Sequence, residues 1–490
     1  MKPLLVLDET LRMGQQALWA TRMRTRWMLP IAPVMDRAGF YQVAAMAPVS
    51  FETAAMYLHE DPWERLRLLR AQMPHTKFDF LVRSRNLVGW SPKPNDVVEL
   101  FLGTLARIGI ASIKVFDGLN DYRNVAYQIE CGKKLGLHVK ALLTFAVSPV
   151  HTDDYLVDKA RQLASLGADA IVIADACGAM LPERARSLVS RIRSALPAME
   201  LHFSTHPNSG VAESCYREAI RHGIDVLWGA SRPMANGHSF PPHQTIIELA
   251  REEGRTVGLD ETCLAQMDDW FSWAAYKERR PIYGPAAFDA ASYEQTIRHQ
   301  IPGGMMSNLK SQLAELGMGH RLQEVLEEAA RVRAEIGYPV MVTPFSQFVG
   351  VQATLNVVTG KRYSTVPREM ALYCRGYYGQ PPGPIDPVVL EHVVGDQPMI
   401  DPTAYYDDRM VDKVRAEKGP ISDEELLTSI FLNPTALEDF QRNRRPIQWD
   451  SSARMPLAAL IRDLGTRPRL RRVSVSHAGM RVALCAESTQ

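Results

Sequence analysis

The stretch HVKALLTFAVSPVHTDDYLVDKARQLASLGADAIVIADA (138–176) contains two short apolar runs separated by a longer amphipathic segment. The runs at its two ends, 138–145 and 169–176, have the length of buried strands. The segment between them, 154–167, carries apolar residues at helical spacing and ends at a glycine, which commonly terminates a helix. The stretch therefore predicts one strand–helix unit followed by the strand of the next unit.

Apolar runs of this kind recur about every 30 residues through the first half of the chain, which is the length of one strand–loop–helix–loop unit. Eight such units in a row favour a closed (β/α)8 barrel over a doubly wound open sheet. The open sheet is also disfavoured because no glycine-rich fingerprint follows the first run, as a dinucleotide-binding fold would require. The eight predicted strands are 3–8, 40–47, 77–82, 112–117, 138–145, 169–176, 200–206 and 225–231.

The pattern changes near residue 300, where long helical segments such as 313–337 begin and proline-rich connections such as PPGPIDP (381–387) follow. We therefore expect a barrel over residues 1–300 and a mainly helical C-terminal appendage over residues 301–445 that completes the active-site funnel. In the tail, residues 446–490, polar and apolar residues alternate on both sides of a glycine. This alternation predicts a β-hairpin.

The composition is that of an ordinary globular protein, with 46% hydrophobic and 23% charged residues. The net charge is +1 and the basic residues are spread along the chain, so no nucleic-acid or membrane-surface footprint is visible. Six cysteines without CxxC spacing suit a reducing compartment, and no run of about 18 apolar residues predicts a membrane span. We expect a cytoplasmic protein with no nucleic-acid partner.

Two predicted strands are followed by arginines at the end where a (β/α)8 barrel holds its active site. Arg12 follows the first strand, and Arg83 and Arg85 follow the third. A guanidinium binds a carboxylate through two parallel hydrogen bonds, so the pattern indicates a small anionic substrate such as a 2-oxo acid. The alternative is that these arginines only pair with acidic residues of the barrel mouth, for which Asp117 and Asp175 are candidates.

Longer motifs lie between about residues 5 and 445. They are DETLRMGQQALWATRMRT (8–25), HEDPWERLRLLRAQMP (59–74), LVRSRNLVGW (81–90), IKVFDGLNDYRN (113–124), FAVSPVHT (145–152), IPGGMMSNL (301–309), GYPVMVTPFSQFVGVQATLNVVTGKRY (337–363) and YGQPPGPIDP (378–387). Together they resemble the carboxyltransferase subunits and domains of biotin-dependent enzymes. That family includes the 5S-type subunit of transcarboxylase, the oxaloacetate decarboxylase α subunit and pyruvate carboxylase.

The resemblance implies a substrate site at the ends of the first and third strands. Arg12, Gln16 and Arg83 match the residues that hold the oxo acid in the family, and Trp90 stands where many members have tyrosine. Ser307 matches the hydroxyl residue, usually threonine, that moves a proton between biotin and the enol.

The family binds a divalent metal, and the resemblance implies that most of its ligands are absent here. The metal-binding aspartate, the carbamylated lysine and the first of two histidines fall on Met13, Ala174 and Ser204, and only His206 is kept. A divalent ion needs three or more protein donors, so we expect the metal site to be lost. Met13 and Ala174 would then line a larger and less polar pocket.

The stretch HFSTH (202–206) contains two histidines that face the same side of the predicted strand, because side chains alternate. They are four residues apart, so their Cα atoms lie ~13 Å apart, which is too far to share an ion easily. We expect His202 to be a hydrogen-bonded core residue and His206 to face the pocket as an acid or base. Asp175 is a further catalytic candidate, or with Cys177 a replacement metal ligand.

The resemblance also bears on cofactors and partners. The family's carrier motif is biotinylated on a lysine near a C-terminus, and residues 419–490 contain no lysine. We therefore expect no cofactor bound in this chain, with carboxybiotin supplied by a separate biotin carboxyl carrier protein. The family habit and the long helical appendage indicate a homodimer.

Three functions remain open at this stage. The first is a repurposed enzyme that binds a 2-oxo acid or similar small carboxylate and carries out metal-independent decarboxylation or carboxyl transfer through an enolate, with Ser307 or His206 moving the proton. The second is an ordinary carrier-dependent carboxyltransferase of the pyruvate and oxaloacetate type, with an unusual metal site. The third is a catalytically inactive scaffold or sensor that partners an active homologue.

Overall fold

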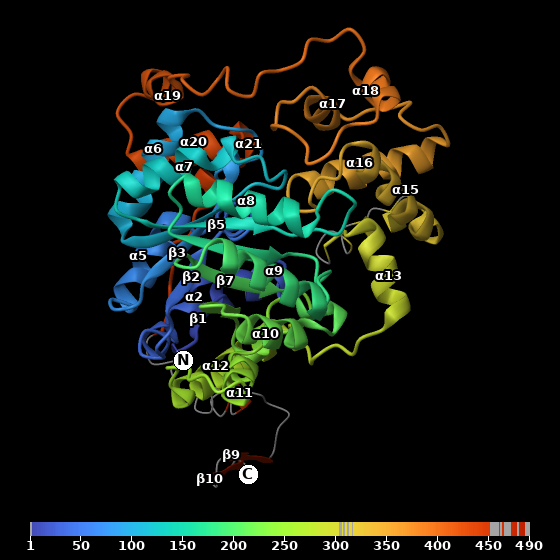
Figure 1. Cartoon of the computed structure of the whole chain (residues 1–490). Helices are drawn as coiled ribbons and strands as arrows, with labels where there is room; N and C mark the ends of the chain where they lie inside the picture. The colour runs from blue at the N-terminus through green and yellow to red at the C-terminus, as the bar shows by residue number, and fades with distance from the viewer. Residues whose placement is uncertain are drawn as a thin grey trace.

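The structure is a computed structural model in which eight parallel strands form a barrel and a helical C-terminal part packs beside it (Figure 1). Ser307, which the family resemblance assigns to proton transfer, lies outside the described residues. The structure describes residues 2–302, 306, 309–310, 313–315, 317–450, 460, 463–464, 472–477 and 480–485.

The strands pair in the order β1 to β8, and β1 also pairs in parallel with β8, which closes the barrel. All eight predicted strands are present, so the predicted (β/α)8 barrel is confirmed. The strands are β1 Leu5–Asp8, β2 Gln42–Met46, β3 Phe78–Arg83, β4 Ile110–Phe116, β5 His138–Thr144, β6 Ala170–Asp175, β7 Glu200–Thr205 and β8 Val226–Gly229.

The helices of the barrel cover the outside of the sheet with one apolar face each. In α10 the buried residues include Cys215, Tyr216 and Ala219, which share one face because Ala219 lies about one helical turn after the other two. The connection after β1 is different, because it consists of a π-helical turn, η1 (Thr10–Gly14), and three helices of four residues each. The helices before residue 300 are α1 Gln15–Leu18, α2 Thr25–Met28, α3 Ala32–Met35, α4 Pro48–Met56, α5 Pro62–Gln72, α6 Asn95–Ile108, α7 Arg123–Lys134, α8 Asp153–Ser165, α9 Pro182–Ala195, α10 Ala212–Arg221, α11 His243–Glu252, α12 Glu261–Glu278 and α13 Ala290–His299.

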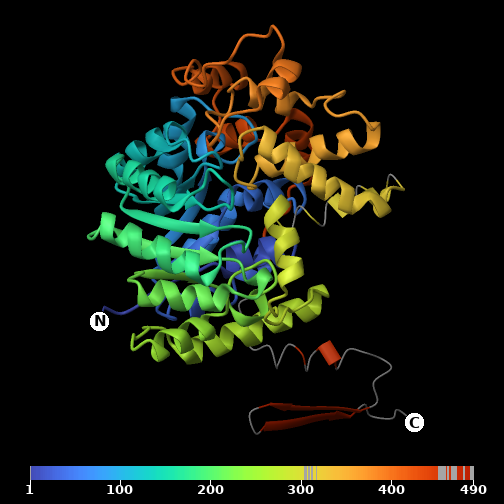
Figure 2. The same ribbon diagram turned by 45° about the vertical axis from the view of Figure 1, so that its right-hand side comes forward.

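The later helices pack on the barrel rather than standing apart from it, as Figure 2 shows. Helix α20 contacts α6, and α21 contacts α4. The ring centroid of Phe431 in α20 lies 6.0 Å from that of Phe51 and 5.3 Å from that of Phe101. The indole of Trp63 donates a hydrogen bond of 3.0 Å to Thr428. The helices are α15 Leu322–Glu335, α16 Phe345–Thr359, α17 Arg368–Cys374, α18 Pro387–Val394, α19 Met410–Lys418, α20 Asp423–Phe431 and α21 Pro434–Asn443.

The helical segment predicted over 313–337 is helical over most of its length, but it is not one continuous helix, because the chain interrupts it near its start. Gly317 has a positive φ of 69°, and a short 3-10 turn, Gly319–Arg321, follows it. Helix α15 begins only at Leu322. Glycine adopts the left-handed region at little cost and commonly ends a helix there, which accounts for the interruption.

The tail contains two antiparallel strands, β9 Arg472–His477 and β10 Met480–Cys485, in the segment where alternation predicts a hairpin. Within the ranges that the structure describes, no helix combines the length and the apolar character needed to cross a membrane.

Replacing Phe431 with alanine should lower the free energy of unfolding by about 3–5 kcal/mol, because a buried ring is removed and a cavity is left. Phe431 is 7% exposed. Equilibrium denaturation in guanidinium chloride measures the change. The control is Val388→Ala on α18, where the side chain is 75% exposed and the expected change is below about 0.5 kcal/mol. Equal losses in the two variants would contradict the packing of α20 on the barrel.

Candidate active site

Arg12 lies just after β1, on the turn η1 at the C-terminal end of the barrel. It is 6% exposed, and its Nη1 lies 3.5 Å from Oε2 of the fully buried Glu9. Its Nε has no hydrogen-bond partner among the described residues. A buried guanidinium with an unused donor is suited to an anion, because a carboxylate can accept from Nε and Nη together.

Arg83 ends β3, at the same end of the barrel. Its Nη1 donates to the carbonyl of Gly89 at 3.1 Å, and its guanidinium lies 5.2 Å from the ring centroid of Trp90. The loop between them turns back on itself through left-handed backbone at Ser84 and Leu87, and this holds Trp90 beside the arginine. Trp90 is 45% exposed, so it is available to a ligand that enters the mouth.

Glu52 on α4 is a site residue that the sequence analysis missed. It is 9% exposed, and burial raises its pKa to about 7 against the opposing effects of the Arg83 charge and a hydrogen bond with Trp90. A carboxyl group that titrates near neutrality is suited to proton transfer. The available signal is that Glu52 is the one charged residue in the helix PVSFETAAM.

Gln15 and Gln16 are neighbours on α1 with different surroundings. The side-chain amide of Gln15 donates to the carbonyl of Leu11 and accepts from the N–H of Met23, so it stabilises the local turn. The Oε1 of Gln16 has no partner among the described residues. Gln16 therefore has the side chain that is free to contact a ligand near Arg12.

Three positions where the resemblance places metal ligands carry no charged group. Met13 and Ala174 pack against the apolar cluster inside the barrel that contains Trp228 and Phe240. Ser204 is buried and lies in register with Ala174 on the neighbouring strand. Two of these three positions therefore belong to the apolar packing of the barrel interior, and Met13 is next to Arg12 in the chain.

His206 follows β7 and is held in one orientation. Its Nδ1 donates to the carbonyl of His238 at 2.7 Å, and its ring stacks on Phe240 with a centroid distance of 4.7 Å. Burial lowers its pKa to about 4, and the charge of Arg12 acts in the same direction. His206 is therefore neutral at pH 7, and its Nε2 is the unprotonated nitrogen.

His202 lies in the barrel interior and not in the mouth. Its Nδ1 accepts from the indole N–H of Trp228 at 3.1 Å, and its Nε2 lies 2.7 Å from Oε1 of Glu200. The indole can only donate, so Nε2 of His202 carries the proton. His202 and His206 thus have separate partners, as their spacing on the strand predicts.

Asp175, a predicted catalytic candidate, has both carboxylate oxygens occupied. Oδ1 accepts from the N–H groups of Cys177 and Ala179, and Oδ2 accepts from the N–H of Met180 and the hydroxyl of Thr205. These four hydrogen bonds organise the loop after β6. The contacts favour a structural role for Asp175 over the proton-transfer role expected from its position at a strand end.

The donor set at the mouth does not fit a divalent metal ion. In the described ranges of the chain, no three histidine, cysteine, aspartate or glutamate side chains form a group that could hold one. The side chains of Met13 and Ala174 contain no oxygen or nitrogen, so Nε2 of His206 and the hydroxyl of Ser204 are the side-chain donors left at the four positions. A tightly bound ion needs three or more protein donors.

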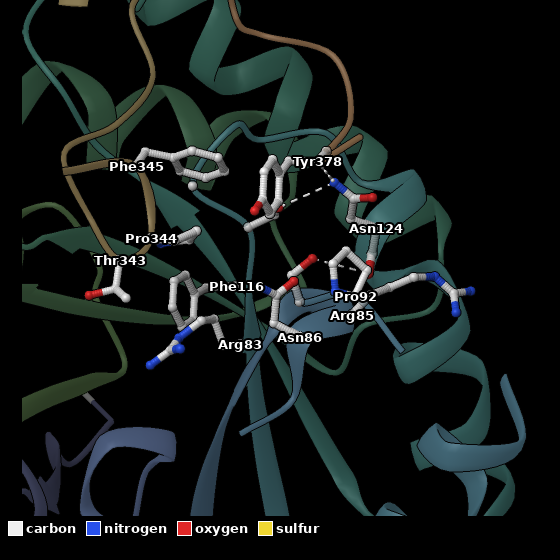
Figure 3. Close-up of a pocket in the computed structure, with 13 residues that line it drawn as sticks. Arg83, Arg85, Asn86, Pro92, Phe116, Asn124, Thr343, Pro344, Phe345 and Tyr378 are labelled. Atoms are coloured by element: carbon white, nitrogen blue, oxygen red, sulfur yellow. Dashed lines mark hydrogen bonds between the residues drawn. The ribbon is translucent and has the colours of Figure 1, made fainter. Parts of the chain in front are cut away.

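A small cavity of about 20 Å³ lies beside Arg83, between the ends of β3 and β4 and the start of α16 (Figure 3). Asp117 lines it, and burial raises the pKa of this carboxyl to about 7. The C-terminal part closes the cavity with Phe345. Gly118 allows this approach, because a Cβ there would lie only 2.7 Å from the Phe345 ring. The helical appendage therefore contributes directly to the barrel mouth.

Comparisons with known proteins agree with this architecture. A family model described as a conserved carboxylase domain matches residues 296–476. The chain is 38% identical over 444 residues to a pyruvate carboxylase subunit of Methanocaldococcus jannaschii, an alignment that covers 89% of this chain and 77% of that protein. It is 34% identical to the 2-oxoglutarate carboxylase large subunit of Hydrogenobacter thermophilus, covering 90% of this chain and 68% of that protein. It is also 34% identical to the methylmalonyl-CoA carboxyltransferase 5S subunit of Propionibacterium freudenreichii, covering 79% and 75%.

A solved structure shows the same fold. The carboxyl transferase domain of Rhizobium etli pyruvate carboxylase, solved with oxamate and biotin, superimposes with a TM-score of 0.84 at 26% sequence identity. The match covers 91% of this chain and 79% of that chain, so it extends well beyond the barrel into the helical appendage.

Replacing Glu52 with glutamine should change how stability depends on pH. Because the pKa of Glu52 is raised in the folded protein, its contribution to stability is complete below its unfolded pKa and is lost as the pH rises through about 7. The free energy of unfolding of the wild type should therefore fall by roughly 2–3 kcal/mol more than that of Glu52→Gln between pH 5 and pH 8.

Denaturation at a series of pH values provides the measurement. The control is Glu130→Gln, because the side chain of Glu130 is 56% exposed and its replacement should leave the pH profile of the wild type intact. A Glu52→Gln profile parallel to that of the wild type would show that Glu52 does not titrate in this range.

Proposed function

The chain belongs to the carboxyltransferase family of biotin-dependent enzymes, and we propose that it is a divergent member that acts on a 2-oxo acid without a bound divalent metal. The observation that carries the proposal is the pair of buried arginines, Arg12 and Arg83, at a mouth where Met13 and Ala174 pack on an apolar cluster. The arginines supply positive charge and hydrogen-bond donors at the strand ends, which is where a (β/α)8 barrel binds its substrate.

The chemistry of a 2-oxo acid explains why two arginines would suffice. In carboxylation, a proton leaves the carbon next to the carbonyl, and the resulting enolate carbon attacks CO₂ to form a new carbon–carbon bond. In decarboxylation that bond breaks, and the carbon takes up a proton. Both directions place negative charge on the enolate oxygen, which preorganised donors in a shielded site stabilise. In this proposal Arg12 and Arg83 supply the stabilisation that a metal ion supplies elsewhere in the family.

Three residues are candidates for moving the proton. Ser307 is assigned the exchange with biotin because it matches the hydroxyl residue of the family. At neutral pH His206 can accept a proton on Nε2 but cannot donate one, because its pKa is about 4. Glu52, with a pKa of about 7, can do either.

The relatives favour carboxyl transfer over decarboxylation alone. They are named as a pyruvate carboxylase subunit, a 2-oxoglutarate carboxylase subunit and a methylmalonyl-CoA carboxyltransferase subunit. We propose that the carboxyl group is exchanged with biotin on a separate carrier protein. The apolar surface at Met13 and Ala174 favours a 2-oxo acid with a bulkier side chain than that of pyruvate. The same relatives support a second candidate, a carrier-dependent carboxyltransferase with an unusual metal site.

Replacing Arg83 with alanine should lower kcat/KM for decarboxylation of oxaloacetate, with free biotin present, by about 10²-fold or more, because one donor to the developing oxyanion is lost. The rate is measured in chelator-treated buffer. Arg85→Ala is the matched control. The guanidinium of Arg85 donates to Lys93 and Asn95 and stacks 3.3 Å from the ring of Tyr406, so its loss should affect stability more than turnover.

The result separates the three functions. Turnover that survives chelation but falls in Arg83→Ala supports the metal-independent enzyme. Turnover that vanishes with chelator and returns with manganese, zinc or cobalt would support the second candidate. If the wild type turned over none of a panel of 3-carboxylated 2-oxo acids, the scaffold function would remain.

A further inference from the structure

Below the barrel mouth, charged side chains form a continuous row through the interior. Glu9, Asp79, Lys114 and Lys140 all have 0% exposure. They come from the end of β1 and from strands β3, β4 and β5, so residues far apart in the sequence meet inside the barrel. We call these four residues the interior ion row.

Lys114 is at the centre of the interior ion row. Its Nζ contacts Oε1 of Glu9 at very short range and lies 2.8 Å from Oδ2 of Asp79. It also lies 4.2 Å from the ring centroid of Trp228. One ammonium group therefore neutralises parts of two buried carboxylates and rests on an aromatic face.

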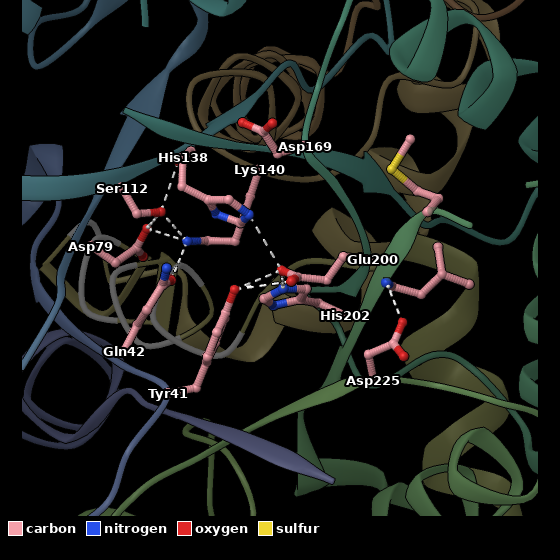
Figure 4. A network of polar contacts seen from close by, with 12 residues as sticks. Tyr41, Gln42, Asp79, Ser112, His138, Lys140, Asp169, Glu200, His202 and Asp225 are labelled. Atoms are coloured by element: carbon pink, nitrogen blue, oxygen red, sulfur yellow. Dashed lines mark hydrogen bonds and ion pairs between the residues drawn. The ribbon is translucent and has the colours of Figure 1, made fainter. Parts of the chain in front are cut away.

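Lys140 completes the row on the other side of Asp79, and Figure 4 shows its side chain directed toward Asp79, Ser112 and Gln42. Its Nζ lies 2.8 Å from Oδ1 of Asp79 and donates to Gln42 and Ser112. Burial alone would raise the pKa of Asp79, but the two lysines outweigh this effect and hold it well below its ordinary value. Asp79 is thus fully ionised and shared between Lys114 and Lys140.

At the far end of the interior, Glu200 has partners outside the interior ion row. Glu200 contacts His202 at 2.7 Å and Tyr41 at 2.9 Å, and its side chain is 27% exposed. The interior ion row therefore carries two positive and two negative charges. Its net charge is zero without any contribution from Glu200 or His202.

At the mouth, Arg12 and Lys114 share the same carboxylate. Arg12 lies 3.5 Å from Oε2 of Glu9, which is longer than a normal charge-assisted hydrogen bond, whereas Lys114 is in close contact with Oε1. Coulomb energy falls with distance, so Glu9 is neutralised mainly by Lys114. Arg12 keeps an Nε without a partner among the described residues. Its charge is therefore largely available to a ligand.

The row has a cost that packing alone does not explain. Buried ion pairs often contribute less to stability than apolar side chains of similar volume, because burial removes the hydration of the charges. In the interior ion row four charges lose their hydration. Other interior positions of the same barrel are filled by apolar residues such as Leu81, Leu142 and Val172. A functional consequence at the mouth gives a reason for charges at these four positions.

We propose that Lys114 is a positioning residue that keeps Arg12 available for the substrate carboxylate by neutralising Glu9 beneath it. The proposal rests on the proposed function, because it assumes that Arg12 binds the anion. Without the lysine charge, Glu9 would draw the Arg12 guanidinium down into a direct ion pair. The mouth would then lose both the donor and the positive charge.

The test is binding of oxamate, an unreactive anion shaped like pyruvate, measured by calorimetry on the whole chain. Lys114→Met should weaken oxamate binding by about tenfold, because Arg12 is then neutralised by Glu9. The oxamate affinity of Lys114→Arg should stay within about threefold of that of the wild type, because arginine keeps the positive charge. The double variant Glu9→Gln with Lys114→Met should recover most of the lost affinity, and it also keeps the interior balanced in charge.

Two further variants keep the test decisive. Glu9→Gln alone should bind oxamate at least as tightly as the wild type, which can be measured even if Lys114→Met does not fold. Arg65→Met is the matched control, because Arg65 is a buried cation, 1% exposed, that pairs with Glu60 outside the barrel mouth. It should lose thermal stability without losing oxamate affinity.

The outcomes separate this proposal from the one it rests on. If Arg12→Gln weakens oxamate binding but Lys114→Met does not, or if the double variant binds no better than Lys114→Met, Lys114 has only a structural role and the proposal is overturned. If Arg12→Gln binds oxamate as tightly as the wild type, Arg12 is not the anion-binding group. The arginine-based function then fails together with this proposal.

Discussion

Side chains that point into a closed barrel are shielded from water, so every charge placed there must find its partner inside. Glu9, Asp79, Lys114 and Lys140 meet this requirement together, and they connect the end of β1 to β3, β4 and β5. Arg12 lies next to Glu9, at the end of this row of charges that is nearest to the mouth. The electrostatics of the mouth therefore depend on how the interior charges are balanced.

The fold could be predicted because its signal is local. Each strand appears as a short apolar run, and each helix such as α10 shows one apolar face, so the barrel and the arginines at its strand ends follow from the sequence. The separation of His202 from His206 also follows, because alternation along a strand needs no tertiary information. The interruption before α15 is not visible in the sequence pattern, because the helical spacing of 313–337 continues across the glycines at 317 and 319.

The charge arrangement could not be predicted in the same way. The lysines in SIKVFD and HVKALLTF are visible as charges inside apolar runs, but their partners, Glu9 and Asp79, are more than 30 residues away from either one. Only the closed barrel brings them together. Glu52 was missed for a similar reason, since its raised pKa depends on burial by residues from other elements. For Asp175 the strand-end position predicts chemistry, whereas its four hydrogen bonds favour a loop-organising role that only the folded loop reveals.

The mouth combines positive charge with an apolar surface. Arg12 and Arg83 are buried and keep donors toward the strand ends, while Met13 and Ala174 add no ligand atom for a hard cation. We infer that guanidinium groups, and not a divalent ion, hold the substrate. The most direct measurement is elemental analysis of freshly purified protein. We expect far less than one equivalent of zinc, manganese or cobalt, and about one tightly held equivalent would contradict this inference.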